Sequence, residues 1–414
     1  MQKTILYLHF LIFLPVTINA QEAYPISPQA KISLITCAPG SALFEAFGHS
    51  AIRVYDIETG IDIAYNYGVF DFDQPNFYLN FAKGYLLYQL GTSSFSNFLY
   101  RYTYFNRSVD EQVLNLTYSQ KMRIYQYLHW NSLPENKAYY YDYFFDNCAT
   151  RPRDVLKQIL GDQLQLDYSF ADTLHYSIRD LTDRYLLKSQ EHAWGDLGID
   201  LCLGAGIDRL ARPSEYVYQP EFLQLAFKNA KIVGKDGQIG PLVASTNNLF
   251  QAKKEQHSEV KSITPTLIFW SLFVLVSLVT AIEINRRQYY MLFFDLALFK
   301  ILGLLGLVLL SIWIFTNHTA AAKNWNILWC WPTHLFITGM WYIKSLRSFI
   351  QFHLIFTVSV NLIIIIFWYW IPQDMHEAFI PIILMIIIRS LVMLLFGLKE
   401  NQVIRLKQNI IQVG

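Results

Sequence analysis

Two short segments of the 414-residue chain carry the residue types of a thiol nucleophile and its base. The first, Phe47–Tyr55, contains His49 in a run of alternating apolar and polar residues. The second, Asp146–Arg151, contains Cys148 just before a helical pattern. A cysteine activated by a histidine can attack an acyl carbonyl and hold the acyl group as a thioester. We therefore predict covalent acyl chemistry, with Cys148 as nucleophile and His49 as base.

The element that carries His49 is predicted to be a β-hairpin. Two alternating runs flank a polar stretch at residues 56–60, which is typical of a hairpin turn. A turn centred there places Gly68 opposite His49 and Asn66 diagonally across on the same face. Asn66 is then the predicted third catalytic residue, which orients the imidazole. A register slip of one residue would move Asn66 to the other face.

The element that carries Cys148 is predicted to be the start of a helix. Val155, Leu156 and Ile159 recur at helical spacing behind it. Free backbone N–H groups at a helix start are expected to lower the pKa of the thiol and to hold an oxyanion. Pro152 fits only the first turn of a helix, so Cys148 lies just before the helix or at a kinked start.

Three polar residues beside these motifs are candidates for substrate binding: Asn147, Arg151 and Arg53. A guanidinium can hold a phosphate head group, but arginine is equally often a structural ion-pair partner. Serine catalysis at Ser50 is disfavoured, because a nucleophile elbow needs glycine where Ile52 stands. Zinc prefers clustered Cys and His, and the sequence has no such pair, so no metal and no cofactor is expected.

The remaining cysteines decide whether Cys148 is free. Cys37 and Cys202 are predicted to lie outside the cytoplasm with it, and Cys330 falls in a hydrophobic segment. A Cys37–Cys202 disulfide is expected in that oxidising location and leaves Cys148 as the odd thiol. A Cys37–Cys148 bridge is the alternative that would abolish the mechanism.

The composition indicates that one part of the chain is soluble and another lies in a membrane. Hydrophobic residues make up 53% and charged residues 16%, and the net charge of +1 gives no field for nucleic acid, which is therefore not an expected partner. The first residues resemble a secretory signal that ends at Ala20, although an uncleaved anchor is the alternative. The predicted organisation is a signal peptide (1–20), an exported soluble domain (21–262) and a membrane domain (263–414).

Five membrane spans are predicted at 264–283, 289–315, 326–343, 349–370 and 378–397. Segments on the predicted inner side carry seven basic residues: Arg286, Arg287, Lys344, Arg347, Lys399, Arg405 and Lys407. The outer loops carry only Lys323, so the positive-inside rule places the soluble domain outside. Asp295, Lys300 and Arg389 lie within spans; Asp295 and Arg389 are close enough to the inner end to snorkel, which leaves Lys300 the more unusual charge.

With these residues in view, the chain resembles the Lnb family, whose members are bacterial lipoprotein N-acyltransferases. The resemblance is carried by Thr36–Gly40, Phe47–Tyr55, Tyr65–Phe72, Tyr143–Asp154 and a multi-span tail that contains Asn324–Asn326. It implies an α+β fold in which the exported domain resembles a circularly permuted papain or NlpC/P60 domain, followed by a helical transmembrane bundle.

The resemblance also implies the partners. A phospholipid would donate an acyl chain to Cys148, and the N-terminal cysteine amine of a diacylated lipoprotein would accept it. The protein would then lie in the bacterial inner (cytoplasmic) membrane with its soluble domain in the periplasm. Two alternatives stay open: a cell-envelope cysteine peptidase or amidase with the same nucleophile and base, and a noncatalytic membrane scaffold.

Overall fold

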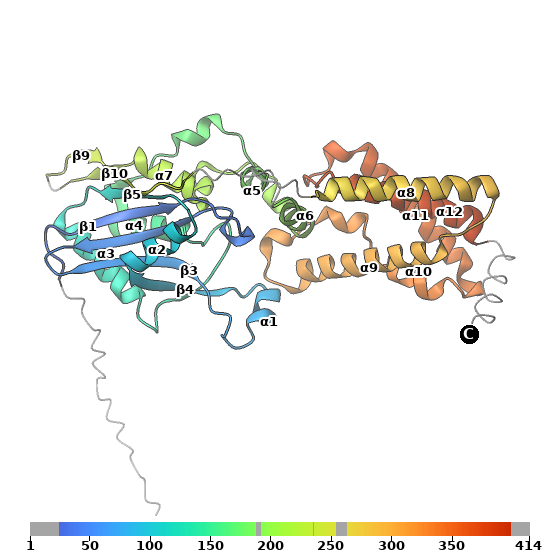
Figure 1. Ribbon diagram of the computed structural model, residues 1–414, viewed down its shortest axis with the longest axis horizontal. Helices are drawn as coiled ribbons and strands as arrows, with labels where there is room; N and C mark the ends of the chain where they lie inside the picture. Colours follow the sequence, from blue (N-terminus) through green and yellow to red (C-terminus); the bar gives the residue numbers. More distant parts are fainter. Residues whose placement is uncertain (1–24, 188–191, 235, 254–262, 399–414) are drawn as a thin grey trace, which may run out of the picture.

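The computed structural model describes residues 25–187, 192–234, 236–253 and 263–398. A mixed α/β domain comes first, and a helical region after residue 263 lies at one end of it (Figure 1). The predicted signal peptide at residues 1–20 lies outside the described residues, as do Lys399, Arg405 and Lys407 of the predicted inner side.

A seven-stranded antiparallel sheet forms the centre of the first domain, in the order β10-β5-β1-β2-β3-β4-β6. Its strands are β1 (Lys31–Cys37), β2 (His49–Asp56), β3 (Ile61–Val69), β4 (Leu87–Ser94), β5 (Val109–Leu114), β6 (Ala138–Tyr140) and β10 (Val243–Phe250). Ile52 lies opposite Tyr65 and Asp56 opposite Ile61, so β2 and β3 form the predicted hairpin in the predicted register. A second, small sheet joins β7 (Leu164–Gln165), β8 (Lys231–Val233) and β9 (Ile239–Pro241).

Helices α3 (Tyr118–Asn131), α4 (Thr150–Leu160) and α7 (Pro220–Lys228) cover one face of the large sheet, and α2 (Phe95–Tyr104) covers the other. The helices α1 (Phe77–Ala82), α5 (Ile178–Leu186) and α6 (Ala193–Cys202) complete this part of the chain. Strand alternation sends Ile32 and Leu34 of β1 to the face covered by α3 and α4. Ile35 and Cys37 point to the other face, which α2 covers. The helix predicted behind Cys148 is α4, with Pro152 in its first turn.

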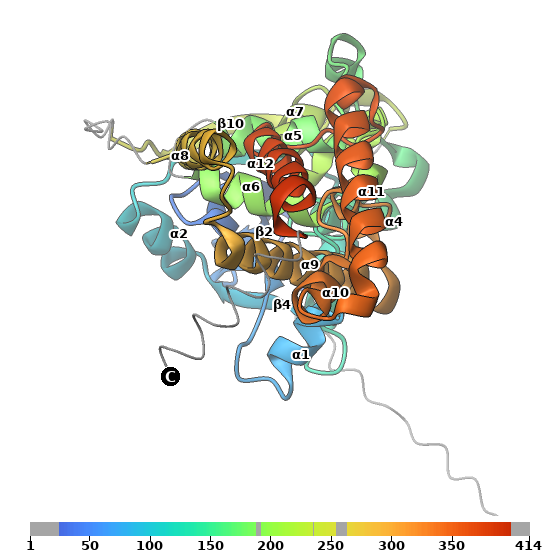
Figure 2. The same cartoon turned by 90° about the vertical axis from the view of Figure 1, so that its right-hand side faces the viewer.

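Among the described residues, four helices are long and apolar enough to cross a membrane. They are α8 (Pro265–Arg286), α9 (Leu292–Phe315), Lys344–Ile366, which contains α11 (Arg347–Ile366), and Phe379–Gly397, which begins with α12 (Phe379–Val392). Viewed from this end of the molecule, α12 lies between α8 and α11 (Figure 2). Their sequence positions match four of the five predicted spans.

The remaining predicted span, residues 326–343, does not form one continuous helix. It contains only the end of a 3₁₀ turn (Trp325–Leu328) and the seven-residue α10 (His334–Met340). Pro332 lies between them, and proline cannot continue the hydrogen-bond pattern of a helix. The broken segment packs closely on α9, since side chains added at Gly303 or Gly306 would collide with the backbone of Leu335 or Cys330.

Two of the three charges predicted within spans pair with each other and do not snorkel. Arg389 on α12 binds Asp295 on α9 at 2.7 Å, and it also contacts Glu283 and Thr280 on α8. Arg389, Asp295 and Glu283 are fully buried. We call these four residues the membrane ion cluster. Lys300 is exposed on the surface of α9.

The outer loops of the membrane region hold the α/β domain through backbone contacts. Asn326 Nδ2 donates to Asp200 O at 2.9 Å, and Gln373 Nε2 donates to Leu203 O at 3.0 Å, so both loops grip the C-terminal end of α6. Asn317 N donates to Lys83 O at 2.9 Å, which ties the loop after α9 to α1. These bonds join the two parts of the chain at α1 and α6.

Candidate active site

Cys148 is held immediately before α4 by its neighbour Asn147. The Asn147 side-chain oxygen accepts the N–H groups of Ala149 (2.8 Å) and Thr150 (2.9 Å), and its amide nitrogen donates to the carbonyls of Tyr143 and Tyr218. Asn147 is 4% exposed. Asn147, predicted to bind substrate, lines the same cavity as Cys148, and its hydrogen bonds fix the turn that carries Cys148 into α4.

His49 is the first residue of β2, and its Nε2 is hydrogen-bonded to Asn66 Oδ1. An amide oxygen can only accept, so Nε2 carries the proton and Nδ1 keeps the lone pair of the neutral ring. The turn before it needs glycine, because Gly48 has φ +78° and a Cβ there would lie 2.7 Å from Cys37 O. The structure thus places Asn66 where the hairpin register predicts it.

One cavity brings the three predicted catalytic residues together. It has a volume of about 500 Å³, and its lining includes His49, Asn66 and Cys148. The backbone N–H of Ser50, which belongs to the peptide bond that follows His49, lies close enough to the Cys148 sulfur to lower the pKa of its thiol. Gly68 closes the same wall, where a Cβ would lie 3.5 Å from Cys148 Cβ. The aromatic lining residues are Phe44, Phe47, Phe70, Phe72, Tyr88, Tyr102, Tyr141, Tyr143 and Tyr218.

The expected low pKa of Cys148 is wrong. Burial raises the pKa of the thiol to about 11, against the opposing hydrogen bond from Ser50. Burial likewise lowers the pKa of His49 to about 4, although the hydrogen bond to Asn66 raises it. Two physical causes explain the difference: the aromatic walls remove water, and Asn147 occupies the N–H groups at the helix start that were expected to face the sulfur. The resting pair is a neutral thiol and a neutral imidazole.

Family models match the two parts of the chain in order. The model of the Lnb N-terminal periplasmic domain matches residues 19–184, and that of the Lnb transmembrane domain matches residues 255–401. The chain belongs to the Lnb family. It is therefore a membrane protein with a periplasmic N-terminal domain, and membership suggests a protein of lipoprotein processing. Comparisons with curated proteins and with solved structures give no match.

In this Lnb protein the two arginines predicted to hold phosphate are occupied elsewhere. Arg53 binds Asp62 at 2.7 Å and Glu111 at 3.0 Å. Arg151 pairs with Asp146 and stacks over the Tyr139 ring at 3.9 Å. Neither is among the described residues that line the cavity. The structure therefore gives them the ion-pair role that the sequence left open as the alternative.

Sequence reasoning missed two other arginines, Arg101 and Arg107, which do line the cavity. Arg107 is buried, binds Glu45 at 2.9 Å and donates to Ala38 O at 2.8 Å. The Arg101 side chain is 64% exposed and lies 4.0 Å from Glu45. The sequence has no motif that relates α2 to the segments of His49 and Cys148. Only the folded structure shows that α2 lies over the same face of the sheet.

The predicted disulfide between Cys37 and Cys202 is wrong. The four cysteines, all within the described residues, are free. Cys37 is buried beneath α2 in the sheet domain, whereas Cys202 ends α6 beside the membrane loops. Their distant positions in the fold explain why they are not bridged. The alternative Cys37–Cys148 bridge is not formed either.

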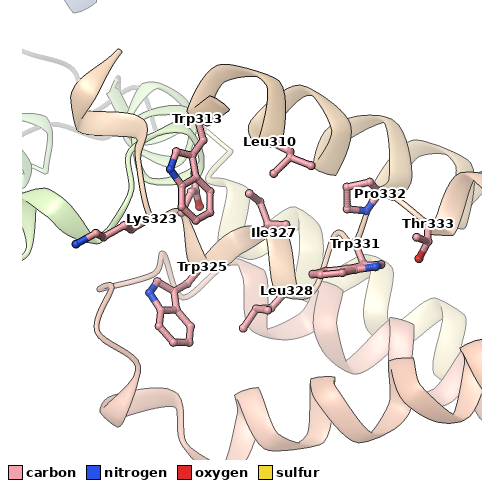
Figure 3. Close-up of a pocket in the computed structure, with 10 residues that line it drawn as sticks. Leu310, Trp313, Lys323, Trp325, Ile327, Leu328, Trp331, Pro332 and Thr333 are labelled. Carbon is pink, nitrogen blue, oxygen red and sulfur yellow. The ribbon is translucent and has the colours of Figure 1, made fainter. Parts of the chain in front are cut away.

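A second, apolar cavity of about 550 Å³ lies in the membrane region between α9 and the segment around the 3₁₀ turn at Trp325–Leu328. Trp313, Trp325 and Trp331 line it together with leucine and isoleucine side chains (Figure 3). Lys323 marks the end nearest the periplasmic domain (Figure 3). Tryptophan is typical of the interface between lipid and water, so this cavity lies at the outer boundary of the predicted membrane domain.

Proposed function

We propose that this Lnb protein is a lipoprotein N-acyltransferase. It would move an acyl chain from a phospholipid through a thioester on Cys148 to the N-terminal cysteine amine of a diacylated lipoprotein. The observation that carries the proposal is the aromatic cavity in which His49, Asn66 and Cys148 meet. The order of His49 before Cys148 supports a permuted papain-like domain, and we infer that the domain extends to residue 262 and lies outside the inner (cytoplasmic) membrane.

In the first half-reaction, the lone pair on His49 Nδ1 takes the proton of Cys148 as the sulfur attacks the ester carbonyl carbon. The backbone N–H groups of Ser50 and Cys148, which lie near the sulfur and lower its pKa, would hold the developing oxyanion. The ester C–O bond then breaks, and the imidazolium returns its proton to the departing glycerol oxygen. The products are an acyl thioester and a lysophospholipid.

In the second half-reaction, the lipoprotein amine attacks the thioester carbonyl and gives up a proton to His49. The C–S bond breaks and the sulfur recovers that proton, so an amide forms and the enzyme returns to its neutral state. No cofactor is required. The aromatic walls exclude water, which would otherwise hydrolyse the thioester.

Access from the bilayer supports a lipid donor. Phe70 and Phe72 of the cavity wall pack on Phe77 of α1, at ring distances of 6.3 and 5.0 Å. α1 in turn rests on the outer loop after α9, where Phe81 O and His318 Nε2 are 2.9 Å apart. The exposed apolar side chains around α1 are Phe72, Tyr78, Leu79, Phe81 and Tyr85. We infer that an acyl chain approaches Cys148 along this apolar surface, since Phe72 belongs both to it and to the cavity lining.

A charged contact at the cavity also suits a phospholipid. Arg101 has an exposed guanidinium at the lining, which could hold a phosphate group. In the membrane, the tryptophan-lined cavity near Lys323 fits a second lipid-chain contact. Arg53 and Arg151 have no part in this proposal, because their ion pairs occupy them.

Mass spectrometry of one lipoprotein's N-terminal peptide tests the proposal. Cells with the wild-type chain and with Cys202→Ala should yield the N-acylated peptide, whereas Cys148→Ala cells should yield a free amine. Altered cell-wall peptides in the Cys148→Ala strain would support a peptidase or amidase. If the Cys148→Ala peptide stays fully acylated in cells without another such enzyme, the proposal is wrong.

A further inference from the structure

Three carboxylates meet at the junction of the periplasmic domain and the membrane helices, outside the active site. Asp183 lies on α5, and Asp196 and Asp200 lie one turn apart on α6. One oxygen from each lies within 4.8 Å of the others. They line a cavity of about 440 Å³ that also borders the start of α8 at Thr264 and the loop before α12 at Asp374.

Arg179, the arginine beside these three carboxylates, pairs with more than one acidic side chain. Arg179 binds Asp200 at 2.6 Å, but it binds Asp208 at the same distance. One guanidinium therefore faces two carboxylates before Asp183 and Asp196 are considered. His376 Nε2 lies 3.5 Å from Asp196, a longer contact than those that Arg179 makes with Asp200 and Asp208.

Asp196 supplies an independent observation that points to a ligand. Its side chain is 4% exposed, and Oδ1 has no hydrogen-bond partner within the described part of the chain. Asp183 Oδ1 is buried without a partner in the same way. A buried carboxylate oxygen without a donor is costly. Two of them beside a cavity point to a positively charged ligand.

We propose that Asp183, Asp196 and Asp200 bind one hard divalent cation, of the class of Ca²⁺. Oxygen ligands 2.3–2.6 Å from Ca²⁺ lie up to about 5 Å apart across the ion, which the observed spacing matches. The cavity has room for water molecules that complete the coordination. A ligand set of carboxylates alone favours Ca²⁺ or Mg²⁺ over zinc, which prefers nitrogen and sulfur. The cation holds α5 and α6 beside the beginnings of α8 and α12.

Protons are the alternative source of positive charge. Burial, and then repulsion from neighbouring carboxylates, raises the pKa of Asp183 to about 8 and that of Asp196 to about 7. Without a cation, these two side chains would therefore hold protons near neutral pH. The two alternatives make opposite predictions about added metal, and neither depends on acyl transfer.

The test uses the full chain in detergent, stripped with a chelator and titrated with CaCl₂ or MgCl₂ by calorimetry. We expect one Ca²⁺ per chain, together with a rise in the thermal unfolding midpoint. Asp196→Asn should weaken Ca²⁺ binding by at least about tenfold, because it removes a charged ligand. The control Asp172→Asn, an exposed acid on another surface, should bind as the wild type does.

Two results would overturn the proposal. The first is wild-type protein that binds neither ion and has the same unfolding midpoint with and without it. The second is Asp196→Asn protein that binds Ca²⁺ with unchanged affinity. If Asp196→Asn fails to fold, the wild-type stoichiometry and midpoint still decide the question.

Discussion

The active-site cavity and the membrane ion cluster both contain buried polar side chains, but they differ in how many hydrogen-bond partners those side chains have. In the ion cluster, Arg389 reaches Asp295, Glu283 and Thr280 together, and its charge is compensated on several sides. In the cavity, His49 uses one ring nitrogen on Asn66, and its other nitrogen makes no hydrogen bond among the described residues. Near the sulfur of Cys148, the backbone N–H groups of Ser50 and Cys148 itself lower the pKa of the thiol.

The difference separates structural from reactive polar groups. A buried ion with every partner in place stabilises one arrangement of helices and has no capacity left for a ligand. A base and a thiol with unused capacity beside a cavity can accept a substrate. If this comparison is right, substitutions in the ion cluster will lower stability, and substitutions in the cavity will lower activity.

The largest expected effect is on acyl transfer in Cys148→Ala. Without the sulfur no thioester forms, so the rate should fall by more than about 10³-fold. A phospholipid-to-peptide transfer assay in detergent would measure it. Thermal unfolding should stay near that of the wild type. Cys202→Ala is the matched control and should keep full activity, since Cys202 lies outside the cavity.

Arg389→Ala should give the largest loss of stability. Removing one member of a buried pair leaves Asp295 and Glu283 uncompensated and should lower the free energy of unfolding by about 3–5 kcal/mol. Denaturant unfolding in detergent micelles would measure the change. Lys300→Ala, on the exposed surface of α9, should have little effect. Equal losses in the two variants would contradict the comparison.

Asn66→Ala should slow catalysis by about 10- to 100-fold, because the imidazole loses the acceptor that orients it. The loss should appear in kcat more than in KM. Asn66 also raises the pKa of His49, so the acid limb of the pH–rate profile should move to lower pH. Asn97→Ala, exposed on α2, is the control. Unchanged kcat and pH profile in Asn66→Ala would exclude a positioning role.

The smallest expected effect is in pH-dependent stability. The pKa of His49 is about 4 in the fold, below its ordinary 6.5, so the unfolded chain binds a proton more readily between these values. Stability from this site is therefore present above pH 6.5 and lost as the pH falls towards 4. Between pH 6.5 and 4.5 the wild type should lose about 1 to 2 kcal/mol more than His49→Gln, measured by unfolding at each pH.

Local patterns were enough to predict the main parts of the site. Strand alternation and the polar turn gave the hairpin register that joins His49 to Asn66, and apolar spacing gave α4 behind Cys148. The pKa of Cys148 could not be predicted in this way, because it depends on burial by aromatic side chains that are spread along the sequence from Phe44 to Tyr218. The role of Arg101 likewise depends on Glu45, which is distant in the sequence, and Arg53 binds distant Glu111 as well as nearby Asp62.

In the membrane region, too, local features could be predicted from the sequence and long-range packing could not. The lengths of the hydrophobic segments predicted four long helices. They could not show that the segment 326–343 is interrupted around Pro332, or that it packs on two glycines of α9. Pairing of Asp295 with Arg389 needed the arrangement of α9 and α12. Long-range contacts thus account for each missed feature.

Trapping the acyl-enzyme tests the central claim most directly. Purified wild-type protein would be incubated with phospholipid without an acceptor, quenched in acid and analysed by peptide mass spectrometry. We predict one acyl chain on Cys148 that is released by neutral hydroxylamine and disappears when a diacylated lipoprotein peptide is added. Transfer to the acceptor with Cys148 unmodified throughout, or with the acyl chain on another residue, would contradict the account.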